Sequence, residues 1–430
     1  AQAAYPHLRK TAPGSALTRC TMAVEEVRVN VNELHPGMFV CRLEGRPWDG
    51  TPFPLQGVMI RTVDDVIAVR QFASHVYVDR VRSVDGTPEA VLLSLDYGGG
   101  GSALRPLPMP LRYANTTTVD EELPRIRFAA NEAQKLSRRL IDDLREGRKL
   151  SIDEISSAVE PVVASVIRNP DAYFWLASLR ERDPYAYSHA VNCAALMSAF
   201  GRQLGFPGAT LVELASAGML MDLGMAALPD GTVNHPLPLD DAQRASMMRH
   251  VAASLEAVDL APGATPLIRS AIQFHHERHD GSGYPEGRRG FEIPLEARML
   301  GIVDTFDAMG STRLHQAAAA RHNVLQALYR ERDRLFQAEL VEQFSQGIGV
   351  YPTGSLVELN SGEVAVVTAQ NSARRLLPKI TVLTWPDKTV NPAFRQVDLW
   401  QQSASDGVRL AIQRALQPGA YGLDLAEFFL

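Results

Sequence analysis

The stretch HHERHDGSGYPEG, residues 275–287, carries the most specific pattern in this sequence. Two adjacent histidines, His275 and His276, are followed by Asp280 and by a turn-forming Gly-Ser-Gly-Tyr-Pro run. A helix that ends at this pair directs the two imidazoles about 100° apart, the angle between successive side chains of a helix. Two neighbouring metal ions can then each take one imidazole. The pair therefore predicts a metal centre at the end of a helix.

Four further polar residues lie scattered through the apolar surroundings of this stretch: His189, Asp222, His250 and Asp304. Asp222 interrupts an apolar run and is costly to bury without a partner, so we interpret it as a carboxylate that bridges two ions. Imidazole and carboxylate without thiolate suit iron, manganese or zinc. Ions about 3.5–4 Å apart form the arrangement that activates water against a phosphodiester.

Each of these residues also has a structural alternative. His189 alone is more often a satisfied buried histidine than a ligand, and His250 fits a surface position after Arg249. His275 and His276 can serve as a helix-capping pair. Asp307, three residues after Asp304, is interpreted as a structural hydrogen-bond acceptor.

The composition is that of an ordinary globular chain of 430 residues, 46% hydrophobic and 21% charged. The net charge of −6 gives no overall attraction to nucleic acid or to an anionic membrane. No apolar run reaches the roughly 18 residues of a membrane-spanning helix, because Asp222 interrupts the longest candidate. Cys20, Cys41 and Cys193 form no paired motif, which favours a reducing compartment. We therefore expect a cytoplasmic protein with no nucleic-acid or membrane partner.

The pattern changes along the chain and predicts a mainly α protein, with an all-helical core between two β-containing flanks. The expected segments are a tail or expression remnant (1–25), a small β-rich domain (26–84), a Gly/Pro-rich linker (85–120), the helical domain (121–346) and a C-terminal extension with a β-hairpin (347–430). The glycines at 98–101 mark the linker as flexible.

Alternation and helical spacing give the expected elements. Strands are expected at 27–31, 38–40, 74–78, 355–359, 363–367 and 379–384, and helices at 64–72, 126–146, 152–169 and 323–344. Ser151 with Glu154 suits a capping box, and Gly147 and Gly205 suit helix ends. The tail to residue 430 shows no clear pattern.

Residues 275–287 resemble the signature of the HD-GYP family, and residues 293–298 and 304–309 (DTFDAM) are similar to the downstream helix of that family. The likeness is close over about 185–313. Residues 34–38 and 76–79 also resemble a small domain of unknown function found ahead of HD-GYP domains. The resemblance implies an all-helical catalytic core, a centre of divalent transition metals, and hydrolysis of the bacterial messenger cyclic di-GMP through pGpG towards GMP.

Carried over position by position, the resemblance implies a set of site residues. Its metal ligands would be His189, Asp222, His250, His275, His276 and Asp304, with Asp222 and His189 central to catalysis. Its ligand-binding residues would be Gly283, Tyr284, Pro285 and Arg313.

Four positions depart from the family pattern. The family's adjacent His-Asp pair reads Met221-Asp222, and a thioether is a poor ligand for a hard divalent ion. Met225 stands where the family has Lys, and Tyr185 where members with a third metal have Glu. Gln316 stands where the family usually has Arg or Lys, a cation that could bind phosphate. Six of the eight ligand positions implied by the resemblance are retained, so we expect one or two ions.

These departures favour a cyclic di-GMP signalling protein whose catalysis is weakened or lost, because losing one electrostatic donor costs about 10²–10³-fold in rate. The alternatives are a fully active phosphodiesterase with a rearranged metal centre and a non-catalytic scaffold for other signalling proteins. A phosphohydrolase acting on another nucleotide is a third, which the GYP loop disfavours. The expected partners are cyclic di-GMP or pGpG, and a homodimer is compatible with the sequence.

Overall fold

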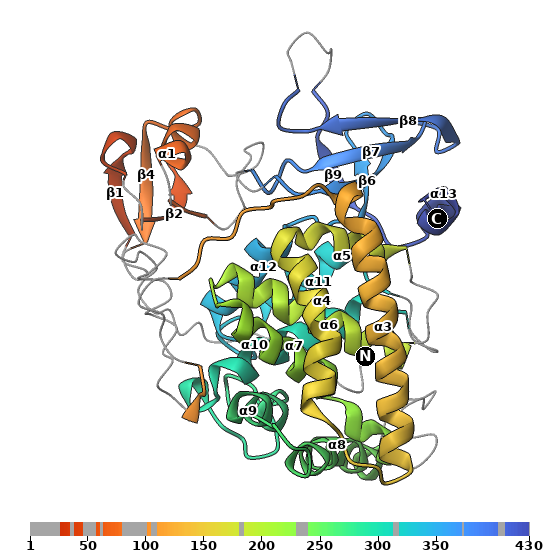
Figure 1. The fold of residues 1–430 in the computed structure, drawn as a ribbon. Coiled ribbons are helices and arrows are strands. Elements are labelled where there is room, and N and C mark those ends of the chain that lie inside the picture. The colour runs from red at the N-terminus through yellow and green to blue at the C-terminus, as the bar shows by residue number, and fades with distance from the viewer. Residues whose placement is uncertain are drawn as a thin grey trace. The chain divides into compact units, whose positions relative to one another are not determined.

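The computed structural model describes residues 26–34, 38–45, 57–60, 63–79, 101–104, 110–179, 185–228, 240–312, 318–371, 374–402 and 409–429. The described chain divides into two compact units, one of residues 26–79 and one of residues 101–104 with 110–429. Strands come first, then a long series of helices, then strands again (Figure 1). The predicted fold class, a helical core with β-containing flanks, is confirmed.

The N-terminal unit is an antiparallel sheet covered by one helix. Its strands are β1 (Glu26–Asn30), β2 (Phe39–Leu43), β3 (Val58–Met59) and β4 (His75–Asp79), in the order β1-β4-β2-β3, and its helix is α1 (Val63–Arg70). Val76 and Val78 alternate into the core, whereas Tyr77 between them stacks with Arg42, whose guanidinium lies 3.7 Å from the ring centre.

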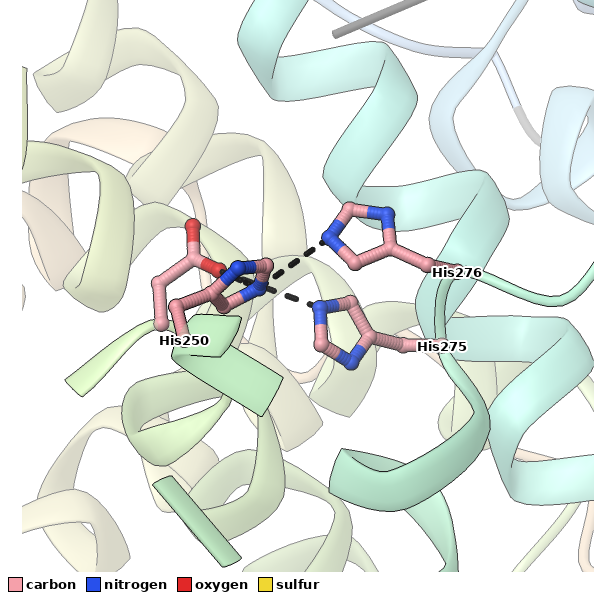
Figure 2. A group of neighbouring side chains, drawn as sticks. His250, His275 and His276 are labelled. Atoms are coloured by element: carbon pink, nitrogen blue, oxygen red, sulfur yellow. Dashed lines mark hydrogen bonds and ion pairs between the residues drawn. The ribbon is translucent and has the colours of Figure 1, made fainter. Parts of the chain in front are cut away.

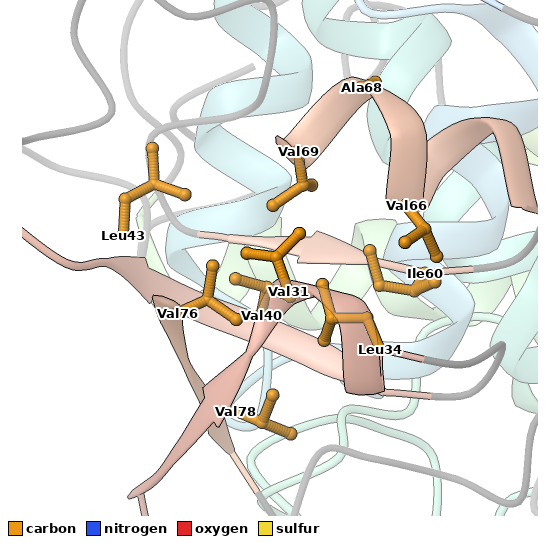
Figure 3. Packing of buried hydrophobic residues seen from close by; sticks show 10 residues of the cluster. All are labelled: Val31, Leu34, Val40, Leu43, Ile60, Val66, Ala68, Val69, Val76 and Val78. Carbon is orange, nitrogen blue, oxygen red and sulfur yellow. The ribbon is translucent and has the colours of Figure 1, made fainter. Parts of the chain in front are cut away.

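The core of this unit is aliphatic, as Figure 3 shows. Its buried residues are Val31, Leu34, Val40, Leu43, Ile60, Val66, Ala68, Val69, Val76 and Val78. The predicted strands and helix of this region are confirmed, with β2 running three residues further than expected.

The second unit contains a long series of helices. They are α3 (Val119–Arg145), α4 (Ile152–Arg168), α5 (Pro170–Ser178), α6 (Tyr185–Gln203), α7 (Gly208–Leu220), α8 (Asp241–Asp259), α9 (Pro266–Phe274), α10 (Leu295–Gly310), α11 (Arg321–Arg330) and α12 (Ala338–Ile348). Gly147 and Gly205 have φ of 70° and 79° just after α3 and α6, which confirms them as helix ends. Ser151 caps α4 by accepting the Glu154 amide.

Helix α3 begins seven residues before the expected start. A capping box at Thr118 and Glu121, in which each side chain accepts the other residue's amide, fixes this start. Ile126, Ala133 and Leu140 are buried at intervals of seven residues, so one face of α3 packs on the other helices.

The single helix expected over 323–344 is wrong, because α11 and α12 are separate. The chain turns back between them, with Asp333 at φ 62° and its amide donating to the carbonyl of Phe336. Leu335 and Phe336 are buried within this break, so the apolar spacing continues although the helix does not.

Helix α7 packs against α6, α4 and α9. A Cβ added at Gly218 would lie 2.7 Å from the Cys193 backbone, so α7 contacts α6 very closely there. By length and composition, Gly208–Ala227 is the one described helical stretch that could cross a membrane, and 61% of its most apolar window is buried inside the fold. Its apolar character is therefore accounted for by the core.

The chain ends in an antiparallel sheet of β5 (Leu356–Leu359), β6 (Val364–Ala369), β7 (Lys379–Thr384), β8 (Val390–Asp398) and β9 (Ile412–Ala415), in the order β8-β7-β6-β5-β9, followed by α13 (Leu425–Phe429). The predicted hairpin β5–β6 and strand β7 are confirmed, whereas β8, β9 and α13 were not expected.

This sheet is built onto the helical unit. Trp175 and Leu179, at the end of α5, belong to the same buried cluster as Leu356 and Val364 of the sheet. The buried carboxylate of Asp171 accepts hydrogen bonds of 2.9 Å from the Thr353 hydroxyl and the Gln370 amide.

Part of the segment expected as a linker is fastened to the helices. The Tyr113 hydroxyl donates to the Phe206 carbonyl at 2.8 Å, and the Thr116 amide donates to Arg168 at 2.9 Å. Further upstream, Ser102 and Ala103 both donate to the buried carboxylate of Glu296 on α10. Residues 80–100, with most of the glycine run, lie outside the described residues.

Candidate metal centre

Five structural elements bring the sequence-predicted ligands together. Helix α7 ends at Leu220, and Asp222 follows in the turn before a 3-10 helix at Leu223–Ala227. Helix α9 ends at Phe274, so His275 and His276 lie at its C-terminus as expected. The remaining ligands lie within helices: His189 in α6, His250 in α8 and Asp304 in α10.

Asp222, His250, His275 and His276 form the first half of the centre, which we call the imidazole cluster. One ligand atom from each lies within 4.8 Å of the others. His275 and His276 therefore belong to one cluster, and the prediction that two ions each take one imidazole of this pair is wrong. Asp222 Oδ1 is 3.2 Å from His250 Nε2 and 3.8 Å from His275 Nε2. His276 Nε2 is 3.2 Å from His250 Nε2. Figure 2 shows the three imidazoles directed toward one another, His250 from α8 and the other two from the turn after α9.

His189, Asp222 and Asp304 form the second half, which we call the carboxylate cluster. His189 Nε2 lies 3.4 Å from Asp222 Oδ2 and 3.4 Å from Asp304 Oδ1. Asp222 thus presents one oxygen to each cluster, as expected of a bridging ligand. Its side chain is 28% exposed, whereas those of His189 and Asp304 are 4% and 5% exposed, so the centre meets solvent beside Asp222.

Hydrogen bonds within helices orient two of the imidazoles. His250 Nδ1 lies 2.7 Å from the Met247 carbonyl, and His275 Nδ1 lies 2.7 Å from the Ile272 carbonyl. A carbonyl only accepts, so both rings carry their proton on Nδ1. Their Nε2 atoms therefore face Asp222 and are the nitrogens left to bind a metal. Burial acts to lower the pKa of His250, but its contact with Asp222 outweighs burial and raises that pKa.

Two buried polar atoms at the centre make no hydrogen bond within the described part of the chain: Asp222 Oδ1 and His275 Nε2. His250 Nε2 and His276 Nε2 lie 3.2 Å apart, close enough for one ion to bind both. Buried polar groups without partners are rare and costly, and a cation between these atoms would satisfy all of them. The donor set therefore fits a divalent transition metal.

The charge states suit a metal as well. Burial acts to raise the pKa of Asp222, but polar contacts with three imidazoles outweigh it and hold that pKa well below its usual range. Burial likewise opposes the ionisation of Asp304, yet contact with His189 keeps its pKa low. Burial together with the neighbouring imidazoles lowers the pKa of His276 well below its usual value. Ionised carboxylates and a neutral imidazole are the ligand forms that metals require.

Close packing fixes Asp222 against His250. A Cβ at Gly224 would collide with the carbonyl of His250 and with the amide of Ser254. The Ser254 hydroxyl accepts the Gly224 amide at 2.7 Å and donates to the Met221 carbonyl at 2.9 Å. The turn that carries Asp222 is thus fastened to α8 at both of its ends.

The loop after His276 folds back over the centre. Tyr284 stacks on the His276 ring, with centroids 4.6 Å apart, and is joined to Pro285 by a cis peptide bond. A Cβ at Gly283 would collide with the His276 carbonyl and the Arg278 amide, so only glycine fits there. The Glu277 carboxylate accepts three consecutive amides, those of residues 286–288, and holds the far side of the loop.

The departing positions are partly described. Met221 is buried at 1% exposure, and Met225 is partly exposed in the 3-10 helix. Tyr185 begins α6, but its side chain lies outside the described residues, as do Arg313 and Gln316.

Three residues around His189 were not predicted as part of the site: Cys193, Asn192 and Tyr173. Cys193 Sγ lies 3.7 Å from His189 Nδ1, and burial raises the pKa of its thiol to about 12. Asn192 donates to Asp307, which contacts His189. The only signal for Asn192 and Cys193 was their spacing of three and four residues from His189, which places them on the same helix face.

The chain is 30% identical over 385 residues to cyclic di-GMP phosphodiesterase PA4108 of Pseudomonas aeruginosa, covering 89% of this chain and 91% of that protein. The chain belongs to the HD-GYP family. Residues 176–340 match the HD domain model, and residues 26–155 match a domain of unknown function, DUF3391. The second match extends beyond the N-terminal sheet into α3 and α4.

Two shorter similarities fall within this HD-GYP chain. It is 35% identical over 146 residues to the cyclic di-GMP phosphodiesterase response regulator RpfG of Xanthomonas campestris, 34% of this chain and 39% of that protein. It is 30% identical over 204 residues to 3'3'-cGAMP-specific phosphodiesterase 2 of Vibrio cholerae, 47% of this chain and 35% of that protein.

Proposed function

We propose that this HD-GYP protein binds cyclic di-GMP at the metal centre and hydrolyses it, through pGpG, more slowly than members with the full set of family residues. The observation that carries the proposal is the asymmetry of the centre. The imidazole cluster offers four ligands, whereas the carboxylate cluster offers three, with Met221 beside the shared Asp222.

HD phosphodiesterases are metal-dependent, and we assign one or two ions of iron, manganese or zinc to the two clusters. Asp222, His250, His275 and His276 would hold one ion, and His189, Asp222 and Asp304 the other. When bound, such ions supply Lewis-acid activation of water and of the phosphodiester. The protein side chains orient these groups, and Asp222 keeps the two sites adjacent.

The substrate assignment rests on the relatives. Two of them are named for cyclic di-GMP and one for 3'3'-cGAMP, so a cyclic dinucleotide is the shared chemistry. Tyr284 stacks on His276 and Gly283 packs against the His276 carbonyl. We propose that these two residues and Pro285 line the nucleotide site, with Arg313 as a further contact.

The weakened catalysis rests on two side chains. A thioether at 221 gives a hard ion no good ligand, and Met225 places no positive charge beside the phosphate. Loss of one electrostatic donor typically lowers kcat by about 10²–10³-fold, and two losses need not add.

The test is turnover by the metal-loaded full chain. The protein is depleted of metal, loaded with iron, manganese or zinc, and incubated with cyclic di-GMP, and the products are separated by chromatography. The double variant Met221→His/Met225→Lys should hydrolyse the messenger much faster than the parent does. Its activity should be only partly restored, because Tyr185 and Gln316 remain. Met248→Lys, which adds the same charge at an exposed position of α8, is the control.

The other outcomes separate the alternatives. Brisk turnover by the parent would show a rearranged but competent centre and overturn the proposal. If both proteins bind cyclic di-GMP but neither hydrolyses it, a signalling module is favoured. If neither protein binds it, a scaffold for other signalling proteins, or for a second copy of this chain, remains. We propose that the protein acts in the cytoplasm.

A further inference from the structure

The imidazole of His189 is oriented by a different kind of contact from those of His250 and His275. Its Nδ1 lies 2.7 Å from Asp307 Oδ2, and the two side chains are only 4% and 7% exposed. Asp307 lies in α10, one helical turn after Asp304, whereas His189 lies in α6. His189 therefore has a carboxylate on each side, Asp307 at Nδ1 and the carboxylate cluster at Nε2.

The two sides of the ring need opposite proton states. An ionised carboxylate at Nδ1 only accepts, so the short contact with Asp307 requires a proton on Nδ1. Nε2 lies 3.4 Å from both Asp222 and Asp304, so it is the nitrogen left to bind a metal, and a proton on it is released when the metal binds. With the proton on Nε2 instead, Nδ1 and Asp307 would be two acceptors in contact.

Asp307 is itself held by a directed chain of hydrogen bonds. Asn192 Nδ2 donates to Asp307 Oδ1 at 2.9 Å, and the Tyr173 hydroxyl donates to Asn192 Oδ1 at 2.7 Å. The side-chain amide of Asn192 accepts through its oxygen and donates through its nitrogen. Because Tyr173 donates to the oxygen, the nitrogen faces Asp307, which is therefore the acceptor. The chain runs from α5 through α6 to α10.

The contrast with the other imidazoles suggests why a carboxylate is used here. His250 and His275 are backed by neutral carbonyls and belong to a cluster with three nitrogens. His189 is the single nitrogen of the carboxylate cluster. A carboxylate behind an imidazole raises its basicity as a ligand and fixes its tautomer, and such partners are typically worth about 10–100-fold in metal affinity.

We propose that Asp307, held by Asn192 and Tyr173, is a positioning residue that keeps His189 in the Nδ1-protonated form and thereby maintains the carboxylate cluster as a metal site. The inference rests on the proposed function only in taking the two clusters as metal sites. It does not depend on which nucleotide is bound or on whether that nucleotide is hydrolysed.

The first test is metal titration of the metal-free full chain with Co²⁺, followed by calorimetry and visible absorption. Asp307→Asn should weaken metal binding at the carboxylate cluster, the site with fewer ligands, by about 10–100-fold. Metal binding at the imidazole cluster should be unchanged. The control is Ser198→Ala, which removes a buried hydroxyl on α6 that donates to the Ala194 carbonyl of the same helix. Equal binding by Asp307→Asn and the parent would overturn the proposal.

The second test reads the tautomer directly and covers the case in which Asp307→Asn fails to fold. ¹⁵N-imidazole spectra of the metal-free parent should show His189 protonated at Nδ1, and Asn192→Leu and Tyr173→Phe should shift the population toward Nε2, with Tyr173→Phe the milder. A parent whose His189 carries a proton on Nε2 and none on Nδ1 would contradict the inference. Hydrolysis enters neither test, so a protein that binds metal as described but cleaves no nucleotide would refute only the proposed function.

Discussion

The imidazole cluster and the carboxylate cluster share Asp222 but are oriented by different kinds of contact. In the imidazole cluster, His250 and His275 are held by carbonyls three residues earlier in the chain. In the carboxylate cluster, His189 is held by Asp307, which is 118 residues away in sequence. One half is thus set largely by local helix geometry, and the other depends on the packing of α6 against α10.

This difference has a consequence for tolerance to change. A contact within one turn survives small shifts between helices, whereas a contact between two helices is lost when their spacing changes by about 1 Å. The carboxylate cluster also has fewer ligands. We therefore expect the imidazole cluster to bind metal first and the carboxylate cluster to bind it more weakly.

The largest effect is expected from Asp222→Ala, because it removes the one ligand common to both clusters. Both classes of site should weaken by more than about 100-fold, since even outer partners of a ligand are worth about 10–100-fold. Elemental analysis after dialysis against Mn²⁺ measures this, with Glu256→Ala removing an exposed carboxylate of α8 as the control. Retention of two ions by Asp222→Ala would show that the clusters are independent.

The next comparison sets His250→Gln against His189→Gln. The first should abolish the tight class of site, and the second should leave that class intact and remove only the weaker one, because the two histidines belong to different clusters. Calorimetric titration of the metal-free proteins with Mn²⁺ resolves the two classes. If both variants lost the same class, the division of the centre into two clusters would be wrong.

A gain is expected from Met221→His. The imidazole cluster already offers four ligands, so a new imidazole beside Asp222 should strengthen the weaker class by about tenfold, or about 1.4 kcal/mol. Met221→Leu keeps the buried volume without a ligand and should bind as the parent does. If Met221→His instead strengthened metal binding at the tight site and left the weaker site unchanged, position 221 would belong to the imidazole cluster.

The smallest effect is expected from Cys193→Ala. Burial raises the pKa of this thiol to about 12, so it stays protonated at neutral pH although its sulfur lies 3.7 Å from Nδ1 and 3.8 Å from Nε2 of His189. Metal affinity should change by less than about twofold, since the thiolate is the form that binds metal. A tenfold change in the same titration would make Cys193 a ligand.

The ease of predicting each half from the sequence follows the same division. His275 and His276 stand out because they are adjacent and precede a turn, and Asp222 because it interrupts an apolar run. The hydrogen bond between His189 and Asp307 has no such signal in the sequence, because it joins two helices that are far apart in the chain. The sequence predicts Asp307 as a structural hydrogen-bond acceptor, and only the fold shows which group it accepts from.

The fold shows the same limit at its ends. The hairpin β5–β6 was predicted because alternating apolar runs flank a turn, whereas β8 and β9 are partly exposed strands with mixed side chains and gave no alternation. The expected helix over 323–344 failed because Leu335 and Phe336 are buried without being helical. Apolar spacing reports burial, and helical geometry has to be inferred from it.

The anchoring of the C-terminal sheet through Asp171 bears on how the protein unfolds. Deleting residues 350–430 would leave both oxygens of a buried carboxylate without the Thr353 and Gln370 donors, at about 1–3 kcal/mol for each lost partner. It would also uncover Trp175 and Leu179. The sheet therefore behaves as the outermost layer of the helical unit, and helices and sheet should melt in one cooperative transition.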